Sequence, residues 1–401
     1  MKESIVITGS GIVSSIGLDK QETLSSLLAG KSGVRPVRYL QTIHREFPVG
    51  EVPLSDEEMK SRLGINAEPT TRTVLMGMLA LDEALGEACL LGSDGRRAIL
   101  VSGTTVGGMD KSEQFFSDYL QNDSRNDYIK IHDCGTTTDM IASRFGIFSM
   151  ATTVSTACSS AANALILGAN LIRSGLTDIA VVGGTECITK FHLNGFHSLM
   201  ILDREPCRPF DATRAGLNLG EGAAWIVLER EHSALQRGVP ILARLSGYGN
   251  ACDAFHQTAS SDDGEGAFLA MDKALRMAGL QPSDIDYVNA HGTGTPNNDA
   301  SESQALRRLF GSSLPPVSST KGMTGHTTSA SGAIESVISL LALRHRFIPS
   351  NVGWHTPMDN GITPVSHVMP DTNLRHVMCN SFGFGGNDSS LIISLYQQHH
   401  E

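Results

Sequence analysis

Cys158 is the residue of this sequence best placed to do covalent chemistry. It lies in the run Thr156-Ala157-Cys158-Ser159-Ser160, between a β-branched segment and an alanine-rich segment with helical periodicity. A thiol at the beginning of a helix meets unpaired backbone N–H groups and the positive end of the helix dipole, and both stabilise the thiolate. Cysteine is also a common buried apolar residue. The run alone therefore leaves a nucleophile and a structural cysteine equally open.

Three later segments place further reactive or glycine-rich groups just beyond predicted strands. The first, Asn289-Ala290-His291-Gly292-Thr293-Gly294-Thr295-Pro296, carries a histidine and two hydroxyls. The second, Ser319-Thr320-Lys321-Gly322-Met323-Thr324-Gly325-His326, carries a lysine and another histidine. The third, Asn380-Ser381-Phe382-Gly383-Phe384-Gly385-Gly386-Asn387, is a glycine-rich loop with two aromatic residues. A single histidine is more often structural. Three such loops together with the cysteine run predict one shared pocket at the edge of a sheet.

Two other kinds of site are disfavoured by spacing. Gly9-Ser10-Gly11-Ile12-Val13-Ser14 resembles a dinucleotide-binding loop, but Ser14 replaces the third glycine and no acidic residue is well placed for a ribose. We therefore interpret this run as a structural turn. The 14 histidines and 7 cysteines contain no H-x-x-x-H or C-x-x-C pair, so no metal site is expected.

The elements that would position these residues alternate along the chain, which indicates α/β layers. Asp299 and Glu302 are spaced as a capping box for the last predicted helix. We expect two halves with a similar order of elements, residues 1–245 and 246–401. Buried strands are predicted at 4–8, 98–102, 152–156, 179–182, 287–290, 317–319 and 377–380, and helices at 161–173, 267–279 and 302–310.

Composition excludes several classes of protein. With 40% hydrophobic and 18% charged residues among 401, the chain is not disordered. Its 31 basic and 42 acidic residues give a net charge of −11, which disfavours nucleic acid as a partner. The longest apolar run, at 337–343, is too short for a membrane span, and the opening residues are too polar for a signal peptide. Scattered cysteines suit a reducing compartment, so we expect a cytoplasmic protein.

The four segments resemble, in order, those of the β-ketoacyl-acyl carrier protein synthases of the elongating type. Two further runs, Cys207-Arg208-Pro209-Phe210-Asp211 and Gly220-Glu221-Gly222-Ala223-Ala224, extend the resemblance over nearly the whole chain. The resemblance implies a thiolase-like fold, with two similar α/β halves in a layered α-β-α-β-α arrangement. The half from 1 to 245 would carry the nucleophilic cysteine, and the half from 246 to 401 would carry the two histidines and the lysine.

The resemblance also implies a reaction and a role for each residue. Cys158 would accept an acyl group from an acyl carrier protein, and malonyl carrier protein would then lose CO₂ and attack it, lengthening the chain by two carbons. His291 and His326 would donate hydrogen bonds to the malonyl thioester oxygen. No metal or organic cofactor is implied. The remaining implied roles are the oxyanion hole and aromatic gate at Phe384, phosphopantetheine binding by Thr293 and Thr295, a buried charge pair of Lys321 with Glu335, and a supporting position for Phe382.

Partners and substrate are expected from the resemblance and from charge. Carrier proteins are acidic, so docking on this acidic chain would need a local basic patch, for which Lys60, Arg62 and Arg72 are candidates. Met200 occupies a place where relatives often have a basic residue. We expect a homodimer, or a heterodimer with a chain-length-factor-like subunit.

Three departures from the commoner family pattern bear on the acyl group. They are the hydroxyl-rich run Thr327-Thr328-Ser329-Ala330-Ser331-Gly332, the ending Gly386-Asn387-Asp388 of the glycine loop, and the absence of Gly-Pro at 148–151. Extra hydroxyls suit a polar or unsaturated acyl chain, so the pathway could make fatty acids or related polyenes and polyketides.

The sequence leaves three alternative functions open. One is a non-extending, chain-length-factor-like subunit, which the joint presence of Cys158, His291 and His326 disfavours. The second is a coenzyme A-dependent thiolase, which would need a second cysteine on the glycine loop. Cys379 precedes that loop, within an apolar strand. The third is a malonyl-carrier-protein decarboxylase that does not extend a chain.

Overall fold

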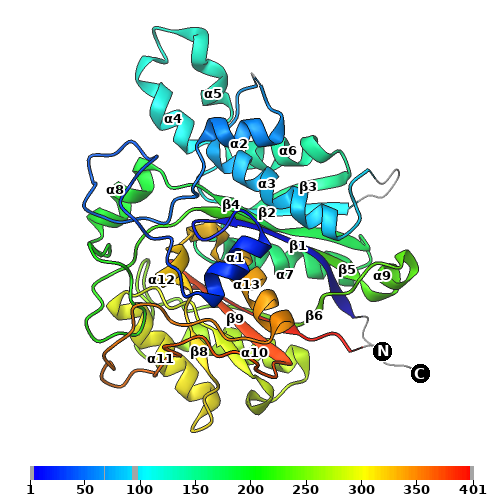
Figure 1. Ribbon diagram of the computed structural model, residues 1–401, viewed down its shortest axis with the longest axis vertical. Helices are drawn as coiled ribbons and strands as arrows, with labels where there is room; N and C mark the ends of the chain where they lie inside the picture. The colour runs from blue at the N-terminus through cyan, green and yellow to red at the C-terminus, as the bar shows by residue number, and fades with distance from the viewer. Residues whose placement is uncertain (1–3, 67, 93–97, 398–401) are drawn as a thin grey trace.

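The computed structural model describes residues 4–66, 68–92 and 98–397. A ten-stranded sheet runs through the molecule in the order β3-β2-β4-β5-β1-β6-β10-β9-β7-β8 (Figure 1). The strands are β1 (Ile5–Ser14), β2 (Ala98–Gly103), β3 (Phe148–Val154), β4 (Ile179–Glu186), β5 (Gly222–Arg230), β6 (Ala243–Cys252), β7 (Tyr287–Asn289), β8 (Val317–Ser318), β9 (His376–Gly383) and β10 (Asn387–Ser394).

The two halves of the sheet have the same topology. In the first half β1 pairs antiparallel with β5 and β5 with β4, whereas β2 lies parallel to both β4 and β3. In the second half β6, β10, β9, β7 and β8 repeat these relations in the same order. The halves join where β1 pairs antiparallel with β6. The division expected at residue 245 falls inside β6, which begins at Ala243.

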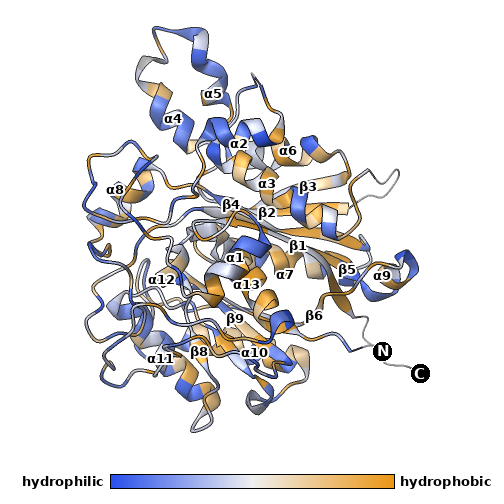
Figure 2. Ribbon diagram, in the orientation of Figure 1, coloured by the Kyte–Doolittle hydropathy of each residue, from blue (hydrophilic) through white to orange (hydrophobic). Residues whose placement is uncertain are grey.

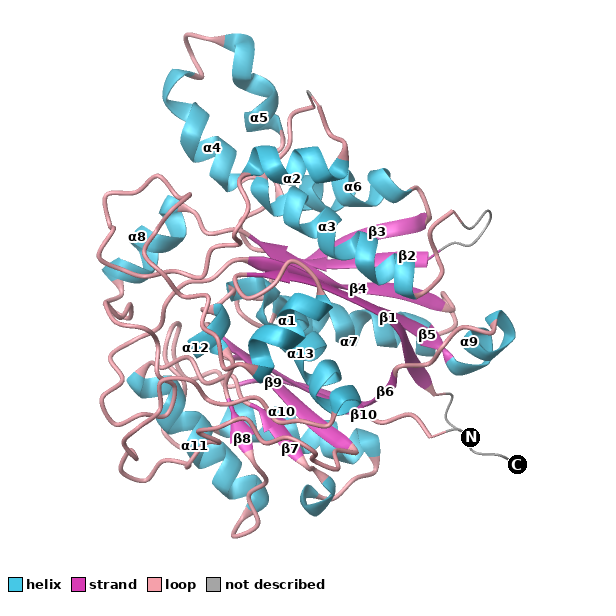
Figure 3. Ribbon diagram, in the orientation of Figure 1, coloured by secondary structure: helices cyan, strands magenta, loops and turns pink. Residues whose placement is uncertain are grey.

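Helices cover both halves and also lie between them, which gives five layers (Figure 3). Helices α7 (Ser160–Arg173) and α13 (Ser331–His345) form the inner layer and share one apolar cluster with strands of both halves. The outer layers are α3 (Arg72–Glu87) with α6 (Cys134–Phe145) on one side, and α10 (Glu265–Ala278) with α11 (Pro296–Phe310) on the other.

The remaining helices are short and lie at the periphery or in loops. They are α1 (Lys20–Leu28), α2 (Asp56–Leu63), α4 (Met109–Phe115), α5 (Asn126–Lys130), α8 (Lys190–Ser198), α9 (Glu231–Arg237) and α12 (Lys321–Thr324), with 3₁₀ turns at Phe116–Asp118, Asp123–Arg125, Pro282–Asp284 and Thr328–Ala330.

The inner helices are largely apolar (Figure 2). Helix α13 is buried on all sides between the two halves of the sheet, whereas α7 leaves Asn170 and Arg173 exposed. Every residue of α13 from Ser331 to Leu343 is buried. Small residues let the two helices approach closely, since a Cβ on Gly332 would lie 2.6 Å from the backbone nitrogen of Ala162. Among the described residues, no helix is both long enough and apolar enough to cross a bilayer.

The glycines of the opening run have a packing role. Gly9 and Gly11 lie within β1, so the expected turn is wrong and the run is a strand. A Cβ on Gly11 would lie 2.0 Å from the carbonyl oxygen of Ala80 in α3, and one on Gly9 would lie 2.3 Å from that of Ala84. Glycine here allows a helix to pack directly on the strand.

The duplicated topology brings the sequence motifs to one place. Cys158 lies between β3 and α7, and the segment from Lys321 to His326 lies between β8 and α13, the equivalent position of the second half. His291 follows β7, and the glycine loop at 383–386 joins β9 to β10. The beginnings of both inner helices and the ends of parallel strands therefore meet at one edge of the molecule.

Candidate functional site

A strained turn presents Cys158 at the beginning of α7. Ala157 has a φ of 52°, in the left-handed region that non-glycine residues seldom adopt. The Ser160 hydroxyl stabilises the turn, since it accepts from the Thr156 N–H at 2.9 Å and donates to the Ala157 carbonyl at 2.6 Å. The cysteine side chain is buried, with 6% of the residue surface exposed.

Two buried histidines face the sulfur. The Nε2 atom of His326 lies 3.2 Å from Sγ of Cys158, and its Nδ1 atom lies 3.0 Å from the Ser331 hydroxyl. The rings of His291 and His326 meet edge to face, with centroids 5.2 Å apart. A thiol and two imidazoles from three separate loops thus share one small space.

Lys321 fixes the state of His291. Its Nζ donates to the His291 carbonyl at 2.6 Å, lies 3.3 Å from His291 Nδ1, and is paired with Glu335. An ammonium can only donate, so Nδ1 must accept and the ring proton must lie on Nε2. Burial, the Lys321 charge and His326 together hold the pKa of His291 well below its usual range. His291 is therefore a neutral imidazole with Nε2–H free to donate.

The cysteine is a thiol, not the thiolate that the helix position suggested. Burial raises the pKa of Cys158 to about 11, and the opposing effects of the Lys321 charge and the Phe384 N–H are smaller. Burial disfavours the charged sulfur more than the Lys321 charge and the Phe384 N–H favour it. Burial also holds the pKa of His326 well below its usual range. The pair is thus a neutral thiol beside a neutral imidazole.

The glycine loop closes over the sulfur. The backbone N–H of Phe384 is hydrogen-bonded to the Cys158 sulfur, and a Cβ on Gly383 would lie 3.2 Å from the Cys158 nitrogen. The Phe384 ring stacks on Phe196 of α8 with centroids 5.9 Å apart. The Phe382 ring lies 5.8 Å from that of His291.

A cavity of about 400 Å³ leads to Cys158 and contains most of the candidate residues. Thr293 and Thr295 both line it, and their hydroxyl oxygens are 2.9 Å apart. The other predicted site residues that line it are Cys158, His291, His326, Phe382 and Phe384. Lys321 and Glu335 lie behind this wall.

The hydroxyl-rich run after His326 faces away from the cavity. Thr327 and Thr328 are buried and bind Ser331 and Glu186 respectively. Neither residue lines the cavity leading to Cys158. These hydroxyls therefore give no support to the expectation of a polar or unsaturated acyl chain.

Glu302 holds the His291 loop, a role that the sequence reading missed. The expected capping box is wrong, because α11 begins at Pro296, earlier than the predicted helix. Glu302 accepts instead from the backbone N–H groups of His291 and Gly292, at 2.9 and 2.8 Å. Asp299 likewise accepts from the Gly294 N–H at 3.1 Å. The Thr-Pro pair before two carboxylates is the signal that could have revealed this.

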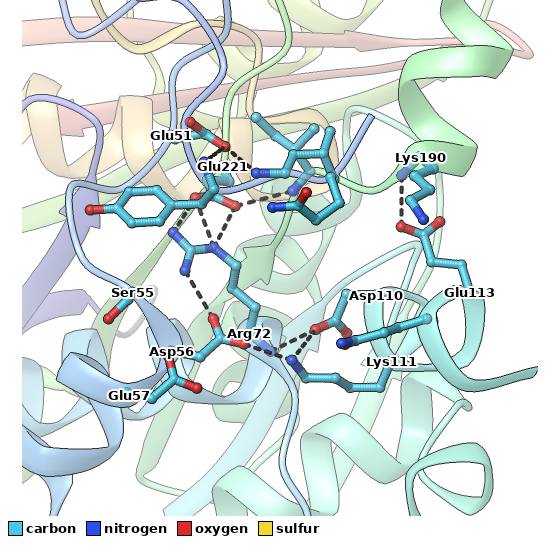
Figure 4. A pocket seen from close by; sticks show the side chains of 15 residues that line it. Glu51, Ser55, Asp56, Glu57, Arg72, Asp110, Lys111, Glu113, Lys190 and Glu221 are labelled. Atoms are coloured by element: carbon cyan, nitrogen blue, oxygen red, sulfur yellow. Dashed lines mark hydrogen bonds and ion pairs between the residues drawn. The ribbon is translucent and has the colours of Figure 1, made fainter. Parts of the chain in front are cut away.

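Arg72 is not a docking residue, which corrects the expectation from sequence. It is buried beside a charged cavity of about 300 Å³, and its guanidinium binds Glu221 at 2.6 Å and Asp56 at 3.0 Å (Figure 4). Of the other two candidates, Lys60 is half-buried and Arg62 exposed, and both lie on α2. Among the described residues, none from α2 lines the Cys158 cavity.

The Arg72–Glu221 pair supports the site from behind. Next to Glu221, the Gly220 N–H donates to the His326 carbonyl at 2.8 Å, and the His326 N–H donates to the Asn218 carbonyl at 2.7 Å. The charge pair therefore anchors the segment that holds the backbone of His326.

Replacing Arg72 by alanine should leave Glu221 buried without its charge partner. We expect R72A to lower the free energy of unfolding by about 3–5 kcal/mol, measured by urea denaturation. The exposed R62A should change it by less than about 0.5 kcal/mol. Equal midpoints for the two variants would contradict this role.

Two carboxylates lie close together beneath the glycine loop. A Cβ on Gly266 would lie 2.2 Å from Asp388 Oδ2 and 2.7 Å from Asp253 Cβ. Asp253 accepts from the N–H and hydroxyl of Ser261, both at 2.7 Å. Burial first, then the charges of Asp253 and Glu302, raise the pKa of Asp388 to about 8.

This shift predicts how stability depends on pH. The unfolded chain loses the Asp388 proton near pH ~4 and the folded chain near pH ~8, so the fold is progressively destabilised as the pH rises between these values. D388N should therefore be more stable than the wild type by up to about 5 kcal/mol near pH ~8 and nearly equally stable near pH ~4. Urea denaturation across this range checks the difference, with the exposed D262N as control. A constant offset at every pH would refute the assignment.

Two other chemistries find no support in the geometry. Cys379 lies in β9 and is buried away from the cavity, as the sequence indicated, so it is not placed as a second catalytic thiol. Within residues 4–66, 68–92 and 98–397, no three His, Cys, Asp or Glu side chains are grouped so that they could hold a metal ion.

Most of the chain matches the sequence profiles of two protein domains, one after the other. Residues 2–234 match the profile of the beta-ketoacyl synthase N-terminal domain, and residues 242–355 match that of the C-terminal domain. The chain is 33% identical to 3-oxoacyl-[acyl-carrier-protein] synthase 2 of Rhizobium meliloti, over 98% of this chain and 99% of that protein. It is 32% identical to the protein of the same name from Coxiella burnetii, with the same coverage.

Solved structures with this fold include ketosynthases paired with a second subunit. The ishigamide ketosynthase/chain length factor matches with a TM-score of 0.91 at 31% identity, over 99% of this chain and 100% of that one. A ketosynthase in complex with its chain length factor from Xenorhabdus doucetiae matches with a TM-score of 0.87 at 31% identity, over 98% of each chain.

Proposed function

The chain belongs to the beta-ketoacyl synthase family, and we propose that Cys158 is the residue on which it carries the acyl group that it extends. The enzyme has the thiolase-like fold and catalyses the condensation of an acyl group with malonyl-acyl carrier protein. The product is a β-ketoacyl-acyl carrier protein two carbons longer. The observation that carries the residue assignment is the 3.2 Å approach of His326 Nε2 to the Cys158 sulfur, beside His291, in one buried cavity.

In the first half-reaction the acyl group moves from one sulfur to another. The Cys158 thiol gives its proton to His326 Nε2 as its sulfur attacks the donor thioester. The departing pantetheine thiolate takes that proton as the new thioester forms. Backbone N–H groups of Cys158 and Phe384 stabilise the oxyanion between these steps. Exchange of one thioester for another stores the acyl group in activated form.

In the second half-reaction malonyl carrier protein loses CO₂. The C–C bonding electrons form an enolate, whose oxygen accepts hydrogen bonds from Nε2–H of His291 and of His326. For this step His326 must carry its proton on Nε2, so Nδ1 loses a proton and Nε2 gains one by exchange with solvent, after which Nδ1 accepts from the Ser331 hydroxyl at 3.0 Å. The enolate carbon attacks acyl-Cys158 and the C–S bond breaks. The departing sulfur takes the proton from His326 Nε2, and a proton from solvent restores the His326 ring to its neutral starting form.

Lys321 acts through His291 in this scheme. Its ammonium holds Nδ1 as an acceptor, and its charge keeps the ring neutral, so Nε2–H always points at the enolate oxygen. Glu335 offsets the buried charge of Lys321. Thiol, imidazole and ammonium groups suffice for both half-reactions, so no metal or organic cofactor is required. All seven cysteines are free, which suits a reducing, cytoplasmic location.

Intact-protein mass spectrometry separates the two half-reactions. After incubation with acyl carrier proteins, the wild type and the exposed-cysteine control C252A should gain an acyl mass that C158A does not gain. H291A should gain the same mass but release CO₂ from malonyl carrier protein at least about 100-fold more slowly, because one enolate hydrogen bond is lost.

Two results would change the assignment. An adduct that persists in C158A would place the acyl group on another residue. Release of CO₂ by the wild type without a longer product would favour a decarboxylase over a condensing enzyme.

A homodimer is part of the proposal, and the edge of the sheet supports it. Among the described strands β3 pairs only with β2, so its other edge is open, and Met150 on it is 44% exposed. An open edge strand readily pairs with another chain. Phe116, Tyr119 and Leu120, on the projecting segment with α4 and α5, are also exposed (Figure 1).

Charge on this edge should separate the subunits. We expect wild-type protein to sediment as a dimer and M150K to shift toward the monomer, since lysine blocks edge pairing. L235K, which changes an apolar residue of similar exposure on α9, should remain dimeric. A monomeric wild type would contradict self-pairing and favour a chain-length-factor-like partner.

A further inference from the structure

An apolar projection stands at the mouth of the Cys158 cavity. Helix α8 ends at Ser198, and the next two residues, Leu199 and Met200, both line the cavity. Met200 is 86% exposed and Leu199 43% exposed. No other part of the described chain buries the Met200 side chain.

The backbone holds Met200 in this position at a cost. Its φ of 58° lies in the left-handed region, and its N–H is bonded to the His197 carbonyl at 2.9 Å. Glycine or asparagine would make this turn more easily. A large apolar side chain, exposed on a strained turn, is unfavourable for the isolated protein and indicates a contact with a partner.

The mouth of the cavity is also uncharged. Among the described residues that line it, none is Lys, Arg, Asp or Glu. Two of the following arginines are already engaged, because Arg208 pairs with Asp203 at 3.1 Å and Arg214 donates to the Pro296 carbonyl at 3.0 Å, whereas Arg204 is exposed. Arg204 does not line the cavity, so the surface at the mouth itself carries no charge.

The occupant follows from the path to the sulfur. If Cys158 is acylated as proposed above, the acyl group arrives on a flexible arm whose carrier protein must stand at this mouth. The chain has a net charge of −11 and repels an acidic carrier at long range. Close contact must therefore come from apolar burial or from a local cation.

We propose that the acyl carrier protein docks here through an apolar contact centred on Met200 and flanked by Leu199. This surface replaces the basic patch expected from the sequence. Its partner would be an apolar patch on the carrier protein beside the point where the arm is attached. The inference rests on the proposed function, because it assumes that a carrier protein delivers the acyl group to Cys158.

The test compares two acyl donors of different size. Acylation of Cys158 is measured with acyl carrier protein and with the same acyl group on free pantetheine, and the ratio of the two efficiencies is taken. Aspartate tolerates the left-handed backbone, so M200D should keep the turn. We expect M200D to lower the ratio by about tenfold or more and M200L by less than about twofold.

Two controls keep the outcomes distinct. L176D places the same charge on an exposed leucine before β4, at the opposite end of that strand from the site, and should leave the ratio unchanged. Raising the salt from about 0.05 to about 0.5 M should change the wild-type KM for the carrier little, because the contact is apolar.

A ratio that M200D leaves unchanged would overturn the proposal, as would a steep rise of KM with salt, which would favour a basic surface. If M200D lost acylation from both donors, the neutral M200N decides by the same ratio. Failure of the wild type to be acylated by either donor would refute the proposed function itself.

Discussion

The contact of Lys321 with His291 and Glu335 is the interaction on which the site depends. A buried ammonium is tolerable only when paired, and Glu335 of α13 supplies the pairing charge. In return the ammonium determines which nitrogen of His291 carries the proton. The buried charge of Lys321 thereby fixes which atom of His291 acts as a hydrogen-bond donor. A substitution of Lys321, Glu335 or His291 alone would therefore disturb the other two.

Duplication explains why so few elements are enough to build this centre. Each half places a loop between its third strand and its inner helix, and one of these loops carries Cys158 while the other carries Lys321 and His326. The two halves are equivalent in topology but different in chemistry: in the proposed mechanism one holds the acyl group and the other stabilises the developing charge. Glu302 then ties the remaining histidine loop to an outer helix.

Local sequence patterns predicted the strands, the loops and the reactive residues in them better than they predicted the long-range contacts of those residues. Strand-end loops identified Cys158, His291, Lys321 and His326, because strand, glycine and reactive residue follow one another in the sequence. Long-range effects were not accessible: the burial that keeps Cys158 a thiol and the carboxylates that engage Arg72 come from distant segments. Glu302 was misread for the same reason, since its partners precede the helix that carries it. Exposure of Met200 likewise becomes visible only in three dimensions.

The close packing of the inner helices has a consequence for tolerance of mutation. Gly332 of α13 meets the backbone of Ala162 in α7 with no side chain between them, within a few residues of His326 and Cys158. The direct packing of the two helix backbones thus sets the distance between the Cys158 thiol and the His326 imidazole. Substitutions elsewhere in the apolar layers can change side-chain volume without changing this distance. Residues at the mouth of the Cys158 cavity can therefore change, and substrate preference with them, while the thiol and the imidazole keep their distance.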